Sequence, residues 1–148
     1  MITKTSTEIA APAEVVWQVF SDVERWPEWT ESVSKLTALD GAELRPGARF
    51  EIRQPRFPKL VWEVTEVEPG VSWTWVTRSP GAATTATHVV RSTGPEATVV
   101  EQVLDQAGVL GGLVARLMAG TTRRYLEMEA AGLKARSEER RRHDATAP

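Results

Sequence analysis

The sequence contains no cysteine, so disulfide bonds, thiolate metal sites and cysteine nucleophiles are excluded. Two histidines without cysteine also disfavour a zinc site, and we expect no metal or other cofactor. No apolar run reaches the roughly 18 residues of a membrane-spanning helix. The N-terminal segment MITKTSTEIAAP lacks the apolar run of a signal peptide, so we expect a cytoplasmic protein.

The sequence lacks the surplus of positive charge that is typical of a nucleic-acid-binding protein. The formal net charge is −2, whereas affinity for a phosphate backbone needs a clustered surplus of lysine and arginine. We therefore expect no nucleic-acid partner. The 148 residues fit one domain with a core of its own, and no linker or internal repeat divides them.

Tryptophan is in excess, with six residues against one tyrosine and three phenylalanines. Each large aromatic side chain can bury about 150–250 Å², so six of them exceed what a domain of this size needs for its core. Two interpretations stay open at this point. The tryptophans simply pack the core, or some of them also line a binding cavity.

Turn signals recur about every 11–14 residues after residue 40, and the segments between them alternate apolar with polar side chains. This pattern predicts an antiparallel meander with one apolar, covered face. Further strands are expected near residues 2–9 and 32–40. The turn signals are Pro46-Gly47, Pro58, Pro69-Gly70, Pro80-Gly81 and Gly94-Pro95.

Alternation also assigns the inward-facing side chains of the strands. The pattern is interrupted between Val64 and Val67, which indicates a β-bulge. The expected inward residues are Phe50, Ile52, Trp62, Val64, Val71, Trp73, Trp75, Thr98, Val100, Gln102 and Leu104.

Two helical segments bracket the sheet. Residues 12–22 place their valines and Phe20 on one side, and residues 109–137 form one long helix in which a single face is apolar. Residues 138–148 are charged and unpatterned, so we expect a disordered tail after one domain at 1–137. A curved sheet closed by one long helix tends to leave a cavity. The predicted apolar face of the long helix is Leu110, Leu113, Val114, Leu117, Met118, Thr121, Tyr125 and Met128.

Several segments resemble a known family. The opening IAAPAEVVWQVFSDVERWPEW and the later RPGARFEI, WEVTEVEPGVSWTW, ATVVEQVLD and LEMEAAGLKARSEE are similar to the polyketide cyclase/dehydrase and lipid-transport branch of the START-like (SRPBCC) helix-grip superfamily. The resemblance covers roughly residues 2–138. It implies an α+β helix-grip (Bet v 1/START-like) fold, in which a curved antiparallel sheet of about seven strands surrounds a long C-terminal helix and two short helices follow the first strand. The family includes lipid carriers, sterol and hormone receptors and polyketide aromatases/cyclases, so the resemblance alone selects no activity.

Pro27 disfavours the helical conformation at Trp26, so the first helical region is expected to end there. The resemblance places this segment near the cavity entrance or at the base of the sheet. Two interpretations of Trp26 and Trp29 therefore stay open. Either both stabilise the fold, or one of them contacts a ligand, and Trp29 is the stronger candidate for that contact. The resemblance also places Trp75 on the cavity side.

The polar residues on inward faces are candidates for chemistry. Gln102 in an apolar layer needs a partner, which is either a ligand or Tyr125, a buried water or a neighbouring strand residue. His88 is either a general acid/base or a hydrogen-bonded structural residue. Thr121, Arg124 and Tyr125 suit a ligand with one polar or anionic end, although an arginine at this position often extends to water.

The leading hypothesis is a binding protein for a small hydrophobic ligand, such as a lipid, polyketide or isoprenoid. The alternative is a polyketide cyclase or aromatase acting in the same cavity, with His88 and Tyr125 as catalytic candidates. A third possibility is a partner-binding module that uses the charged tail and the outer face of the sheet. The expected ligand-binding residues are Trp29, Phe50, Ile52, Trp62, Val64, Trp73, Trp75, His88, Gln102, Leu104, Leu113, Leu117, Thr121, Arg124 and Tyr125.

Overall fold

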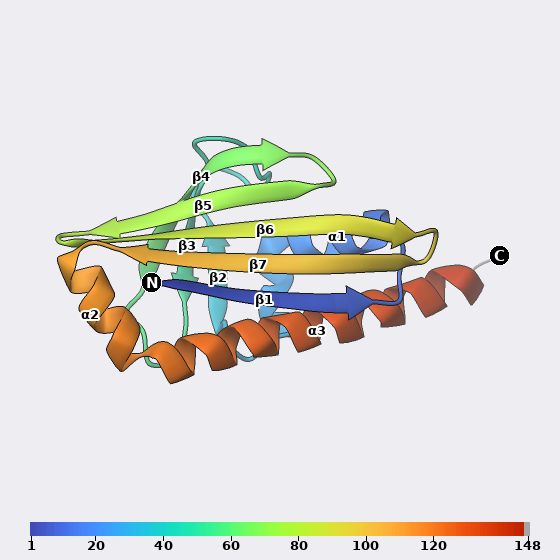
Figure 1. The fold of residues 1–148 in the computed structure, drawn as a ribbon. Coiled ribbons are helices and arrows are strands. Elements are labelled where there is room, and N and C mark those ends of the chain that lie inside the picture. The colour runs from blue at the N-terminus through green and yellow to red at the C-terminus, as the bar shows by residue number, and fades with distance from the viewer. Residues whose placement is uncertain (147–148) are drawn as a thin grey trace.

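The structure, a computed structural model, describes residues 1–146. It contains seven strands, three α-helices and one 3-10 helix (Figure 1). In chain order these are β1 (Ile2–Ile9), α1 (Ala13–Ser21), the 3-10 helix η1 (Val23–Glu28), β2 (Lys35–Ala38), β3 (Arg49–Arg53), β4 (Leu60–Glu68), β5 (Ser72–Ser79), β6 (Ala82–Gly94), β7 (Ala97–Ala107), α2 (Val109–Leu117) and α3 (Ala119–Thr146).

The strands form one antiparallel sheet in the order β1-β7-β6-β5-β4-β3-β2. Strands β2 to β7 follow one another as a meander, and β1 joins its end by pairing with β7. Gly70 and Gly81, at positive φ angles of 80° and 75°, make the turns that join β4 to β5 and β5 to β6. The predicted meander and helix-grip fold are therefore confirmed.

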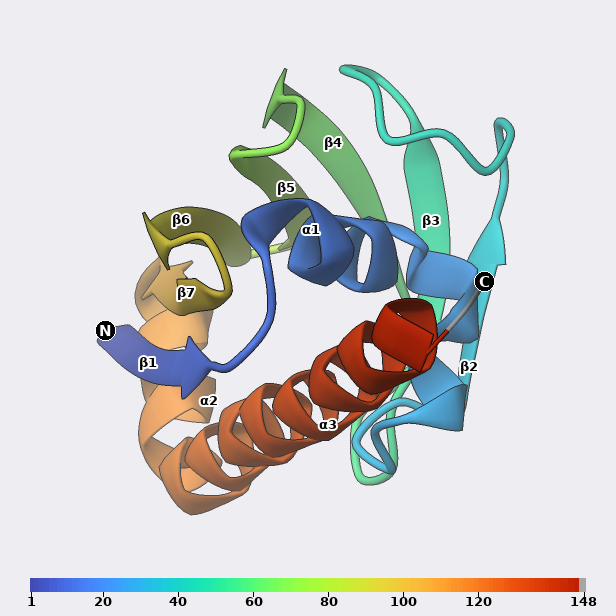
Figure 2. The ribbon, with the colours of Figure 1, turned by 90° about the vertical axis from the view of Figure 1, so that its right-hand side faces the viewer.

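The sheet is strongly curved. Seen from one end, β1, β7 and β6 form one side of an arch and β4, β3 and β2 the other (Figure 2). Helix α3 runs along the open side of this arch, in contact with β1 and α1. The concave face of the sheet and α3 therefore enclose the interior of the molecule.

The inward faces of the strands follow the predicted alternation. Phe50, Val64, Trp73 and Trp75 are all buried, and the expected irregularity in β4 lies between Val64 and Glu66. Val71 is the exception. It lies in the turn before β5, where its N–H donates to the carbonyl of Glu68, and its side chain is 40% exposed. The turn interrupts the strand period, so Val71 does not continue the inward row.

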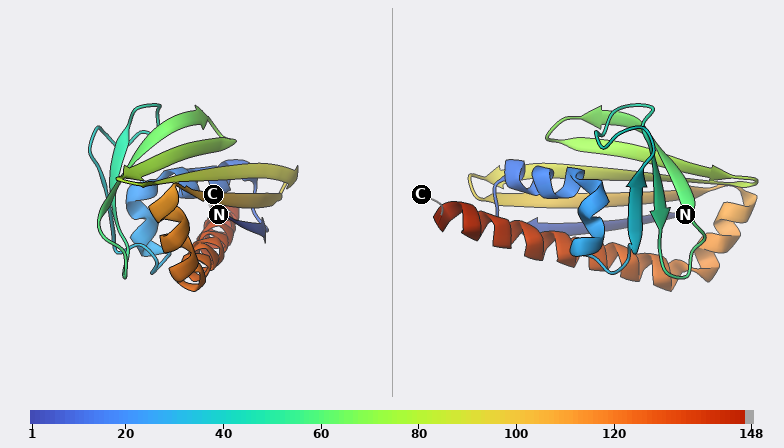
Figure 3. Two further views of the ribbon diagram at one scale, coloured as in Figure 1. Left: turned by 60° about the vertical axis from the view of Figure 1, so that its left-hand side comes forward. Right: turned by 180° about the vertical axis from the view of Figure 1, so that it is seen from behind.

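Helix α1 forms where four apolar residues recur at helical spacing: Val15, Val16, Val19 and Phe20 are buried. The following 3-10 helix η1 continues through Pro27 to Glu28, two residues further than the sequence predicted. Proline fits this short 3-10 segment because its φ is compatible with it. Seen from behind, η1 lies beside β2 (Figure 3), and the two elements are in contact.

The predicted single helix over 109–137 is two helices, with a break at Met118. On α2 the buried residues are Gly111 and Ala115, whereas Leu113 and Leu117 are 56% and 76% exposed. Gly111 lies against Ala82 of β6, so small side chains let α2 approach the sheet closely. The predicted face was wrong at Leu113 and Leu117, because it followed the large apolar residues.

The buried face of α3 is also rotated by about one residue from the prediction. It consists of Thr122, Leu126, Glu129, Ala130, Leu133 and Ser137, while Thr121, Tyr125 and Met128 are only partly buried. The break at Met118 separates the helical phase of α3 from that of α2. A single stripe drawn across both helices therefore misplaces the inward side of the second.

Helix α3 extends through Thr146, so residues 138–146, which we expected to be disordered, are helical. Two contacts hold this end: the Glu138 carboxylate accepts the N–H of Ala10 at 2.9 Å, and Arg141 pairs with Glu96. Residues 147–148 of the expected tail lie outside the described residues. Within residues 1–146, no helix is both long and apolar enough to cross a membrane.

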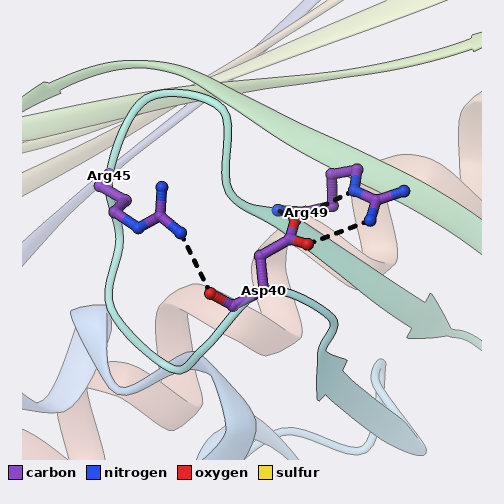
Figure 4. Close-up of polar contacts among 3 residues, drawn as sticks. All are labelled: Asp40, Arg45 and Arg49. Carbon is purple, nitrogen blue, oxygen red and sulfur yellow. Dashed lines mark hydrogen bonds and ion pairs between the residues drawn. The ribbon is translucent and has the colours of Figure 1, made fainter.

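The connection between β2 and β3 is held by a small polar cluster (Figure 4). The carboxylate of Asp40 accepts hydrogen bonds from the Arg49 side chain, at 3.0 Å from both Nε and Nη2, and from the Arg49 backbone N–H. Arg45 donates to the backbone carbonyl of Asp40. The hydrogen bonds from Arg49 lower the pKa of Asp40. These contacts order an exposed loop on the outside of the arch.

Candidate functional site

A cavity of about 370 Å³ lies inside the arch. Its wall comes from the central strands β3 to β7, from α2 and α3, from η1, and from the connection between β3 and β4. The volume falls in the range of small-molecule sites. Most of the wall is apolar, and its larger side chains are Trp26, Ile52, Phe57, Leu60, Trp62, Trp75, Leu104, Val114 and Leu126.

Seven of the sequence-predicted binding residues line this cavity. The side chains from β3, β4 and β5 reach it because the sheet curves around it, and His88 of β6 and Gln102 of β7 add polar groups. A role in binding for each of them stays a prediction. The seven are Ile52, Trp62, Trp75, His88, Gln102, Leu104 and Tyr125.

Four other predicted binding residues lie in the core around α1 and η1, away from the cavity wall. Phe50, Val64 and Trp73 are fully buried, and Trp29 packs against the same core. Trp73 contacts the rings of Trp17 and Phe20. Helix α1 fills this end of the arch, so the inward face of the sheet is divided between packed core and open cavity.

The remaining four predicted binding residues lie on the outside of the helices. Leu113, Leu117 and Arg124 are exposed, and Thr121 is only partly buried and does not line the cavity. Thr122, the next residue along α3, lines it instead. This change follows from the rotated phase of α3, and it removes the arginine that would have suited an anionic ligand.

Trp26, rather than Trp29, lies at the cavity. Its ring stacks on Phe20 at 5.6 Å, and its Nε1–H donates to the Phe20 carbonyl at 2.9 Å. Trp26 therefore both packs the core and contributes one face to the cavity wall. Trp29 is the more peripheral of the two, and its backbone carbonyl lies against Gly132 of α3.

A buried polar cluster at the cavity wall links the sheet to α3. Gln102 donates from Nε2 to the Glu129 carboxylate at 3.0 Å, and the Ser32 hydroxyl lies 3.5 Å from the same carboxylate. Thr30 is 2.7 Å from the Ser32 hydroxyl, and Thr5 donates to the Gln102 carbonyl oxygen at 3.5 Å. The partners of Gln102 are thus Glu129 and a residue of the neighbouring strand.

Glu129 is a buried carboxylic acid on the cavity wall. Burial raises its pKa to about 7, while the hydrogen bonds from Gln102 and Ser32 oppose this rise. At neutral pH, protonated and ionised forms are both populated. Such a group can exchange a proton with a bound molecule, and when ionised it has unused acceptor capacity.

His88 is buried and electrically neutral. Burial lowers its pKa to about 3, and a 3.3 Å contact of its Nδ1 with the Trp73 carbonyl opposes this only in part. Its ring is stacked on Trp73 at 4.1 Å. A base this weak is poorly matched to proton abstraction near neutral pH. The geometry therefore favours the structural interpretation of His88.

Tyr125, the second catalytic candidate, has its hydroxyl engaged. It donates to the backbone carbonyl of Pro55, and its ring meets Phe57 edge-on at 5.6 Å. These contacts tie α3 to the connection between β3 and β4. Within residues 1–146, no three histidine or acidic side chains are grouped so that they could hold a metal ion.

Residues 2–138 match the family model described as polyketide cyclase / dehydrase and lipid transport. The chain belongs to this family. No curated protein matches it in sequence.

Several solved structures share the fold of this member of the polyketide cyclase/dehydrase and lipid transport family. The Zhui aromatase/cyclase from Streptomyces sp. R1128 has a TM-score of 0.77 at 15% identity, covering 95% of this chain and 94% of its own. A START superfamily protein from Mycobacterium smegmatis has a TM-score of 0.72 at 21% identity, covering 93% and 97%. Norcoclaurine synthase from Thalictrum flavum, solved with dopamine and hydroxybenzaldehyde, has a TM-score of 0.74 at 15% identity, covering 94% and 87%. At these identities the likeness shows the fold.

Among the cavity residues of this family member that the sequence interpretation missed, Glu129 is the one with an ionisable side chain. A charged side chain in a helix is usually solvated, and the predicted stripe had the wrong phase. The spacing of Thr122, Leu126, Glu129 and Leu133 is nevertheless helical, with steps of four, three and four residues. A helix phase taken from Leu126 and Leu133 would have placed Glu129 inside.

Proposed function

We propose that this protein binds a small hydrophobic molecule, of the lipid, polyketide or isoprenoid kind, in the cavity between the sheet and α3. The observation that carries the proposal is the wall itself, in which aromatic and aliphatic side chains surround a few polar groups. Burial of an apolar ligand there is favourable by about 25 cal/mol for each Å² removed from water. Family membership is in keeping with this function.

Native mass spectrometry of the freshly purified protein, followed by organic extraction, identifies a ligand that copurifies. We expect a discrete excess mass that passes into the organic phase. The protein should then bind N-phenylnaphthylamine, an uncharged dye whose fluorescence rises in apolar surroundings. A protein that neither carries a ligand nor binds this dye contradicts the proposal.

A cavity-filling variant locates the bound dye. Thr84 lines the cavity, whereas the side chain of the next residue of β6, Thr85, alternates to the other face. Thr84→Phe should weaken dye binding by about tenfold or more, and Thr85→Phe should leave it unchanged. Thermal unfolding of both variants checks that the folds are intact. Equal weakening by both substitutions would mean that the dye binds elsewhere.

A second candidate function is catalysis by proton transfer, as in a polyketide cyclase or aromatase. The observation that favours it is Glu129, whose pKa of about 7 suits a general acid/base. Glu129→Gln should then abolish turnover of a polyketide mimic, while His88→Asn should leave most of it. A protein that binds the mimic without converting it would leave binding as the function.

A further inference from the structure

The cavity wall carries no positive charge. Among the described residues that line it, the ionisable side chains are His88, Tyr125 and Glu129, and there is neither lysine nor arginine. A carboxylate or phosphate that entered would lose its hydration without meeting a cation. It would also meet the Glu129 carboxylate, and like charges at close range disfavour each other.

The hydrogen atoms of His88 can be assigned from its contact with Trp73. A carbonyl oxygen only accepts, so the 3.3 Å contact is a hydrogen bond when Nδ1 carries the hydrogen. The ring is neutral at ordinary pH. Nε2 is therefore a lone-pair acceptor, and His88 contributes an acceptor to the cavity wall.

Three further groups on the wall are acceptors. The Glu129 carboxylate receives hydrogen bonds from Gln102 and Ser32 and has lone pairs to spare. The Gln106 carbonyl oxygen is buried without a partner among the described residues, and the Tyr125 oxygen has already donated its hydrogen. All of these residues line the cavity.

An uncharged donor without a partner also lies on this wall. The Nε1–H of Trp62 is buried without a partner among the described residues, and Trp62 also lines the cavity. A hydroxyl group both donates and accepts, so it can satisfy acceptors and this donor together, whereas a carboxylate only accepts. The wall thus offers several acceptors and only neutral donors, and there is no cation among the described residues that line it.

We propose that the ligand's polar end is an uncharged hydroxyl or phenol that donates to Glu129, and that the cavity rejects carboxylates and phosphates on the same carbon skeleton. This inference rests on the proposed function of hydrophobic ligand binding. It replaces the anionic end that Arg124 suggested in the sequence, because Arg124 is exposed and lies off the cavity wall.

Three probes of one skeleton test the proposal: naphthol, naphthoate and naphthalene, titrated calorimetrically into the full chain near pH 8. At that pH naphthol is neutral and naphthoate is ionised. Naphthol should bind about tenfold more tightly than naphthalene, because a hydrogen bond to a charged acceptor stabilises its complex. Naphthoate should bind at least about tenfold more weakly than naphthol.

Glu129→Gln separates recognition from a merely structural role. The amide keeps the shape and can still bond to Gln102, so we expect naphthol to lose most of its advantage, naphthoate to improve and naphthalene to stay unchanged. A structural role would weaken all three probes together. Glu127→Gln is the matched control, since Glu127 is an exposed glutamate on the same helix and should change none of the three affinities.

Each result has a distinct meaning. Naphthoate that binds the unmodified protein as tightly as naphthol overturns the proposal, and this comparison needs no variant to fold. Equal weakening of all three probes by Glu129→Gln overturns the role of Glu129. If none of the three binds the unmodified protein, it is the proposed binding function that fails.

Discussion

Glu129 and His88 face the same cavity, and burial shifts their pKa values in opposite directions. Desolvation disfavours the charged form of each group, which is the deprotonated form of the acid and the protonated form of the imidazole. The pKa of Glu129 therefore rises to about 7 and that of His88 falls to about 3. Between these values both groups tend to be neutral, so the cavity is most apolar in mildly acidic solution.

The Glu129 pKa predicts a loss of stability with rising pH. The folded protein holds this proton more tightly than the unfolded chain, whose carboxyl titrates near 4.5. The stabilisation is fully present below about pH 4.5 and is lost as the pH rises through 7, with a total on the order of 3 kcal/mol. Urea unfolding at pH 5 and pH 8 should show this loss as a fall in the stability of the unmodified protein relative to Glu129→Gln, because the opposite contribution of His88 is common to both. If the variant has the same pH dependence, the carboxyl is not buried as described.

His88 predicts the opposite trend on the acidic side. Its folded pKa of about 3 lies below the unfolded value of 6.5, so its stabilisation is present above pH 6.5 and is lost as the pH falls towards 3. Between about pH 6.5 and 5 the unmodified protein should lose roughly 2 kcal/mol relative to His88→Asn, whose amide can still donate to the Trp73 carbonyl. Urea unfolding at the two pH values measures this difference. An unchanged difference would mean that His88 titrates normally.

At the scale of the elements, the strands could be predicted and the phase of the last helices could not. The alternation of side chains along the strands, with its period of two, correctly assigned the inward-facing residues Phe50, Trp62, Trp73 and Trp75. It could do so because each strand pairs locally with the next. The orientation of α2 depended on close packing of Gly111 and Ala115, and hydrophobicity carries little signal from residues that small. Large leucines on α2 were left exposed as a result.

Gly132 determines how closely α3 approaches η1. A Cβ atom at this position would overlap the backbone carbonyl of Trp29, so any other residue forces α3 away from the end of η1. Gly132→Ala should destabilise the protein by about 1–3 kcal/mol or more. Gly120→Ala is the control on the same helix, because its added methyl group meets no atom within 4 Å and alanine is the better helix former. Equal melting temperatures for the two variants would contradict the close contact.

At the scale of the molecule, the site is assembled from segments distant in sequence. Glu129 meets Ser32 across 97 residues and Gln102 across 27, and these contacts depend on the phase of α3. Of the fifteen binding residues predicted from the sequence, seven line the cavity. The prediction failed for Trp73, Val64 and Phe50, because α1 occupies one end of the arch and these side chains pack in the core there.

The most direct test of a ligand in this cavity is a two-dimensional NMR titration of the tryptophan indole N–H signals with N-phenylnaphthylamine. Trp26, Trp62 and Trp75 line the cavity, whereas Trp17 and Trp73 lie in or against the core around α1. The signals of the first three should shift most and saturate together, with the smallest change at Trp17. Shifts centred on Trp17, or no shift at any of the six indoles while the dye is bound, would contradict the account.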